Sequence, residues 1–188
     1  SLFNKNRKSL HKEHINQSAN NEIKMWFDSY DDLFSDFDPN PYSTRVLSDD
    51  FIFQLKKVTK TSLAKNFTLV FLFPENVRNK KDEIKINLRL QDFFNFQANF
   101  LKKQIRKKIK QGIYLTFIGI FFLIIAGYIS FSNPNIFYIH LILIVSEPAG
   151  WFLLWTGLEK LFNSTIKIKG ELQFYSKITE TTINFSSF

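Results

Sequence analysis

The sequence has no cysteine and few residues that interrupt regular structure, with six glycines and five prolines among 188 residues. Without cysteine the chain forms no disulfide, binds no zinc through thiolates and has no cysteine nucleophile, as is typical of a reducing compartment. No catalytic motif and no metal-ligand spacing is present either. The sequence therefore favours a protein that is not an enzyme and that holds neither a cofactor nor a metal ion.

Charge is also missing from one long stretch of the chain. Between Gln111 and Leu158 the only charged side chain is Glu147. Two apolar segments, 113–130 and 136–158, lie in this stretch and are joined by the uncharged turn 131–135. Each is close to the roughly 20 apolar residues that a helix needs to cross a bilayer. A turn this short permits only a reversal, so we expect a transmembrane hairpin over 111–158.

The net charge of +8 is concentrated beside the apolar segments and is absent from their turn. We call the residues before the first segment the basic collar: Lys102, Lys103, Arg106, Lys107, Lys108 and Lys110. Lys160, Lys167 and Lys169 follow the second segment. The positive-inside rule then predicts that both termini are cytoplasmic. The collar is expected to bind an anionic leaflet, at about 1 kcal/mol for each basic residue, and not nucleic acid.

The rest of the chain predicts a small cytoplasmic α+β domain of about three strands, with the hairpin inserted into it. Residues 1–21 are polar and aperiodic, which predicts a mobile arm. Residues 22–110 are expected to form the α+β domain and a basic helix, and residues 159–188 a tail that completes it. Strands are expected at 22–27, 66–73 and 181–185, and short helices after Ser29 and Ser48. Gly170 is expected to break the helix that leaves the membrane.

The segment 83–90 is ambiguous. Ile84, Ile86, Leu88 and Leu90 alternate with polar residues, which is typical of a strand. From Leu90 to Ile109, however, apolar residues keep helical spacing, and nothing breaks the chain before the membrane. We favour one helix from about Lys80 to Ser130 and leave the strand open.

Glu147 is the first candidate for function, because an ionised side chain at mid-bilayer costs about 2.5–3.5 kcal/mol, and a residue this costly within a membrane usually has a functional role. His140 lies two helical turns earlier on the same face, and Trp151 and Trp155 continue that face. Pro148 removes a backbone donor and frees a carbonyl one turn back. One interpretation is a protonated Glu147 that bonds to Thr116, Tyr128 or that carbonyl and locks the two helices together. The alternative is a proton or ion pathway.

Small residues recur every seven positions in both apolar segments, at Gly112, Gly119 and Ala126 and at Gly150 and Gly157. Such stripes allow transmembrane helices to approach closely, and we predict a packing role within the hairpin or between copies. Trp151 and Trp155 are expected to anchor the hairpin at the inner leaflet interface.

Two stretches resemble a family of small, uncharacterised bacterial inner-membrane proteins with two membrane helices. Residues 26–34 and 37–42, WFDSYDDLF and FDPNPY, resemble its opening strand and L-F-x-x-x-D-P-x-P-F turn. Residues 147–159, EPAGWFLLWTGLE, are similar to its E-G-x-x-I-x-x-W-V-x-L-W pattern. Pro148, and Gly157 where that family tends to have proline, depart from the pattern. The resemblance implies a long helix that runs into the membrane, and it implies no activity.

These observations together predict a non-enzymatic protein of the bacterial inner membrane, anchored by the hairpin. Its cytoplasmic domain is expected to bind a protein partner or a second copy. The alternative is a small oligomeric channel, or a proton-coupled subunit, that uses Glu147.

Overall fold

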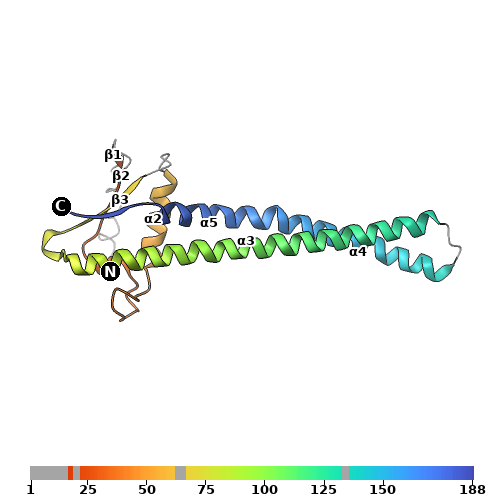
Figure 1. Cartoon of the computed structure of the whole chain (residues 1–188), viewed down its shortest axis with the longest axis horizontal. Coiled ribbons are helices and arrows are strands. Elements are labelled where there is room, and N and C mark those ends of the chain that lie inside the picture. The colour runs from red at the N-terminus through yellow and green to blue at the C-terminus, as the bar shows by residue number, and fades with distance from the viewer. Residues whose placement is uncertain (1–16, 19–21, 62–66, 133–135) are drawn as a thin grey trace, which may run out of the picture. The chain divides into compact units, whose positions relative to one another are not determined.

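A computed structural model describes residues 17–18, 22–61, 67–132 and 136–188. Its elements, drawn in Figure 1, are β1 (Gln17–Ser18), β2 (Glu22–Trp26), the 3-10 helix η1 (Tyr30–Leu33), α2 (Asp49–Thr61), β3 (Thr68–Phe73), the 3-10 helix η2 (Glu75–Val77), α3 (Lys80–Phe131), α4 (Phe137–Leu161), α5 (Asn163–Thr179) and β4 (Ile183–Ser187). The chain divides into two compact units. Unit 1 comprises Ser1–Phe96 and Phe174–Phe188, and unit 2 comprises Gln97–Gln173.

Unit 1 is built on a small sheet in the order β1-β2-β3-β4. Strands β2, β3 and β4 are parallel, and β1 pairs with β2 in the antiparallel direction. The three strands predicted from the sequence are confirmed. β3 is the central strand, and five of its six residues are buried, which explains its almost continuous apolar sequence. β1 lies inside the segment predicted to be a mobile arm, and the rest of that arm, 1–16 and 19–21, is outside the described residues.

Short-range hydrogen bonds explain why the elements of unit 1 begin where they do. The carboxylate of Asp32 accepts hydrogen bonds from the backbone N–H groups of Asp28 and Ser29 at the start of η1. Asn79 caps α3, because its side-chain oxygen accepts the N–H of Lys81 at 3.0 Å. The structure confirms the predicted short helix after Ser29 and the predicted start of a long helix near Lys80.

The α2 helix belongs to unit 1 and contributes one apolar face to its core. Phe51, Leu55 and Val58 are buried on it, and Ile52 beside them is half-buried. Around Phe27, Phe51 and Phe71, ring centroids lie 5.3 to 5.9 Å apart in edge-to-face arrangements, which form the centre of an aromatic core.

α3 is one continuous helix of 52 residues, and this settles the ambiguity over 83–90. Ile86 and Leu90 are fully buried, whereas Ile84 and Leu88 are mainly exposed. The alternation was therefore misleading. The two buried residues are four positions apart, the spacing of one helical face, and the other two are surface residues.

The prediction that Gly170 breaks the helix that leaves the membrane is wrong. α5 runs from Asn163 to Thr179 without interruption, and an added Cβ at Gly170 would meet nothing within 4 Å. A single glycine in a helix costs about 1 kcal/mol relative to alanine. Favourable packing elsewhere on the helix, such as the burial of Tyr175 and Ile178, compensates for that cost.

Two helices are long and apolar enough to cross a membrane, α3 and the α4–α5 segment. In their most apolar stretches only 17% and 6% of the residues are buried. The core helix of a soluble domain would be mainly buried, so these stretches expose apolar surface that another phase or molecule must cover. The turn predicted between them falls partly at 133–135, outside the described residues.

Candidate functional site

The small residues of unit 2 form the contact between α3 and α4. Gly112, Gly119, Ala126, Gly150 and Gly157 are all buried, and we call them the glycine seam. A Cβ added at Gly119 would lie 2.5 Å from the backbone nitrogen of Leu154 and 2.8 Å from the carbonyl oxygen of Gly150. One added at Gly112 would instead meet Leu161 and Gly157. Residues later in α3 therefore meet residues earlier in α4, and the two helices are antiparallel.

Gly157 shows how closely the backbones approach. A Cβ at this position would clash with the hydroxyl of Thr116 and lie 2.6 Å from the backbone nitrogen of the same residue. The Thr116 hydroxyl is buried and has no hydrogen-bond partner among the described residues. Thr116 thus contributes to the helix contact, at a different place from the Glu147 bond that the sequence suggested for it.

Glu147 lies on an exposed face of α4. Its side chain and that of His140 are exposed, as are Trp151 and Trp155, at 59% and 73%. Among the residues that the structure describes, no hydrogen bond joins Glu147 to Thr116 or Tyr128. The described contact between α3 and α4 is made at the glycine seam and by neighbouring side chains such as Leu123 and Leu161, and it does not include Glu147.

The basic collar lies on α3, in unit 2, and is available to solvent. Lys102, Lys103, Arg106, Lys107 and Lys110 are exposed, and Lys108 is half-buried. Leu101, directly before the collar, and Ile105, within it, are buried. Their spacing gives this part of α3 one apolar face and one basic face. Lys167 and Lys169 are exposed on α5, and Lys160 is half-buried near the end of α4.

Unit 1 contains a charged cluster that the sequence analysis missed. Arg78 donates from Nε to Oε1 of the buried Glu83 at 2.8 Å, and the Tyr30 hydroxyl donates to the same oxygen at 3.0 Å. Arg78 also donates to the carbonyl oxygen of Phe185 in β4, and Tyr30 accepts the N–H of Asn79. The cluster therefore ties together η1, the start of α3 and β4. Tyr30 and Glu83 are 53 positions apart, so no local pattern could have revealed it.

The same contacts shift the ionisation of all three side chains. The hydrogen bond from Arg78 holds the pKa of Glu83 below its ordinary value, and that bond raises the pKa of Arg78 in turn. Burial raises the pKa of Tyr30. Glu83 is thus a carboxylate at neutral pH, and the cluster stabilises the fold without any free acid or base.

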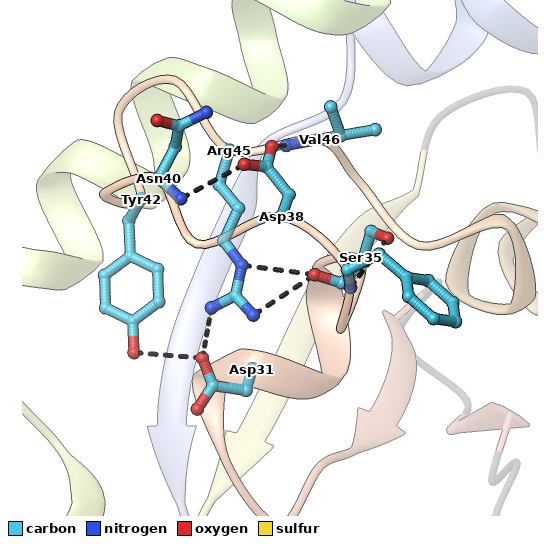
Figure 2. A network of polar contacts seen from close by, with 8 residues as sticks. Asp31, Ser35, Asp38, Asn40, Tyr42, Arg45 and Val46 are labelled. Carbon is cyan, nitrogen blue, oxygen red and sulfur yellow. Dashed lines mark hydrogen bonds and ion pairs between the residues drawn. The ribbon is translucent and has the colours of Figure 1, made fainter.

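A second polar network organises the loop between η1 and α2 (Figure 2). The guanidinium of Arg45 donates to Asp31 at 2.5 Å and twice to the carbonyl oxygen of Ser35, at 3.3 and 3.1 Å. Asp38 accepts the backbone N–H groups of Asn40 and Val46, which lower its pKa. These are turn-stabilising roles, which are typical of aspartate side chains in loops.

A shallow cavity of about 340 Å³ opens beside this loop. Its lining includes Tyr42, Arg45, Asp82 and Lys85. Across the described part of the chain, no three His, Asp or Glu side chains gather closely enough to hold a metal ion.

Comparisons with protein-family models, with curated proteins and with solved structures find no match for this chain.

Proposed function

We propose that this protein is a non-enzymatic membrane anchor, in which α3 and α4 cross the bilayer as a hairpin and unit 1 binds a protein partner or a second copy. The observation that carries the proposal is the connection between β3 and β4. These neighbouring strands are parallel, so the chain between them is a crossover. That crossover contains both apolar helices.

The crossover restricts the topology of any membrane insertion. β3 precedes the first apolar helix and β4 follows the second, yet the two strands exchange hydrogen bonds within one sheet. A chain that crosses a bilayer between them must return to the side from which it left. Two crossings satisfy this condition, and the predicted hairpin makes two.

Charge supports the cytoplasmic side for unit 1. The basic collar precedes the apolar part of α3, and Lys160, Lys167 and Lys169 follow that of α4. Basic residues on both flanks favour retention of those flanks in the cytoplasm. The resemblance of 26–42 and 147–159 to small bacterial inner-membrane proteins supports the same location.

Labelling of single cysteines tests the topology, and the cysteine-free chain needs no background substitutions. Ser132 follows the last residue of α3, and Ser187 is exposed at the end of β4. In intact cells a membrane-impermeant maleimide should label Ser132→Cys, and it should label Ser187→Cys only after permeabilisation. Labelling of both from outside would overturn the orientation. Protection of both until permeabilisation would overturn the insertion.

A second candidate function is a small oligomeric channel, or a proton-coupled subunit, that uses Glu147, and the exposure of this side chain on the helix pair leaves it available to line a path between copies. Ionisable groups within membranes line such pathways. Purified protein in liposomes with a trapped pH dye should then conduct protons, and Glu147→Gln should abolish conduction because an amide releases no proton. Equal conduction by Glu147→Gln and the wild type would eliminate the pathway.

A further inference from the structure

One stripe of α4 combines an unpaired acid with a free backbone acceptor. His140, Ile144, Glu147, Trp151 and Trp155 are separated by four, three, four and four residues, which places them along one side of a helix. All five are exposed. We call this set the Glu147 stripe. It does not include Gly150 and Gly157, which are buried against α3.

The stripe presents both halves of a hydrogen bond. Pro148 has no N–H, so the carbonyl of Ile144, four residues earlier, lacks its helical donor. A protonated carboxyl at Glu147 supplies a donor on the same stripe, and no described residue pairs with it. In a bilayer, lipid tails satisfy neither group.

Hydrogen-bond complementarity, and not an ion pair, supports a second copy as the molecule that covers the stripe. Between Gln111 and Leu158 the chain has no Lys or Arg, so a second copy offers no cation to Glu147. It offers instead another Glu147 and another free Ile144 carbonyl. Copies inserted in the same orientation hold these groups at the same depth, where two-fold symmetry lets each acid meet its equivalent. His140 lies about 10 Å away along the helix axis, at 1.5 Å per residue, and faces its own equivalent.

We propose that the Glu147 stripe is the contact between two copies of this chain in the membrane, with each Glu147 hydrogen-bonded across the interface as the neutral acid. This inference rests on the proposed insertion of α3 and α4. Each copy supplies a donor and an acceptor, so the contact is self-complementary and leaves neither group unsatisfied in lipid.

Disulfide formation between single cysteines tests which side of α4 faces the neighbour. Ile144 lies on the stripe, and Val145, about 100° further around the helix, is its matched control. The two are equally exposed, at 69% and 66%. In liposomes that contain the purified full-length chain, a lipid-soluble oxidant should convert Ile144→Cys to a disulfide dimer and leave Val145→Cys monomeric. Equal yields from both variants, or no dimer from Ile144→Cys, would overturn the proposal.

Substitutions of the acid test its part in the contact. In fluorescence energy transfer between labelled copies in liposomes, Glu147→Gln should associate nearly as well as the wild type, because an amide both donates and accepts. Glu147→Leu should associate about 5- to 30-fold more weakly, the effect expected from one interhelical hydrogen bond in a membrane. Unchanged association of Glu147→Leu would exclude the acid from the interface.

The same variants separate this proposal from its rivals. If Glu147 instead pairs with a basic residue of another membrane protein, the purified chain should stay monomeric, and association should appear only when a transmembrane peptide with a central arginine is added. That result would replace the second copy with a cationic partner. Correct Ser132 and Ser187 labelling without Ile144→Cys dimers would refute the interface alone and leave the membrane anchor intact.

Discussion

The most direct consequence of the structure is that Gly119 should not tolerate even a methyl group. An alanine Cβ at this position would lie 2.5 Å from the backbone nitrogen of Leu154, whereas ordinary contacts begin near 3.4 Å. The clash is with backbone and not with a flexible side chain. To relieve it, the α3 and α4 backbones must therefore separate locally by about 0.9 Å, the difference between these distances.

This separation has a predictable cost. A gap of 0.5–1 Å removes about a quarter to a half of the attraction between the atoms on either side, and overpacking of a well-packed contact typically costs about 1–3 kcal/mol. Alanine also favours a helix by about 1 kcal/mol over glycine, which acts in the opposite direction. The gain in helix propensity must be measured separately before the packing contribution to the unfolding free energy of Gly119→Ala can be determined.

Gly127 supplies that measurement. It lies on the same helix, eight residues after Gly119, and an added Cβ there meets nothing within 4 Å. Gly127→Ala should therefore be neutral or slightly stabilising, and Gly119→Ala should be about 1–3 kcal/mol less stable than Gly127→Ala. Gly157→Ala should resemble Gly119→Ala, because its Cβ also meets backbone. Gly150→Ala should cost less, since the closest atoms are in the Leu123 side chain, which can move.

The assay is reversible unfolding in mixed micelles of a mild detergent and dodecyl sulfate. It is followed by the distance between two spin labels, one on α3 and one on α4, so that it reports on unit 2 alone. Equal stabilities for Gly119→Ala and Gly127→Ala would refute the close approach of the two backbones, and with it the argument that the glycine seam holds the hairpin together.

Three further outcomes follow from the structure. Replacement of Glu83 by glutamine should destabilise unit 1 by about 1.5–3 kcal/mol, seen as faster hydrogen exchange in β3. Because the pKa of Glu83 is lowered in the fold, its contribution should be complete above about pH 4.3, the ordinary unfolded value, and should fall away at lower pH; the glutamine variant should lack this acid-dependent loss. Arg45→Ala should speed exchange of the Val46 amide without altering β3, and uniform acceleration throughout unit 1 would contradict a local role for the loop network. Glutamine in place of all six basic-collar residues should remove a preference for anionic over neutral liposomes, and an unchanged preference would exclude the collar from lipid binding.

Much of the architecture follows from local sequence alone, because its causes are local. The capping of α3 by Asn79 depends on residues within one turn of the helix start. Burial on both faces makes β3 almost continuously apolar, so its apolar sequence predicted a central strand. The seven-residue recurrence of glycine predicted close helix packing, and the length and lack of charge of 113–130 and 136–158 predicted two helices able to cross a membrane.

Other features were decided only when distant parts of the chain came together. Strand alternation at 84–90 and a glycine break at 170 were both reasonable readings of local propensity, and packing on α3 and α5 overrode them. The cluster of Tyr30, Arg78 and Glu83 exists only because the sheet and the start of α3 meet. Whether Glu147 faces α3 or the outside depends on the rotation of α4 about its own axis. The glycine seam sets that rotation, because backbone contact at Gly150 and Gly157 is possible on only one side of the helix, and Glu147, three residues before Gly150, is left exposed beside that contact.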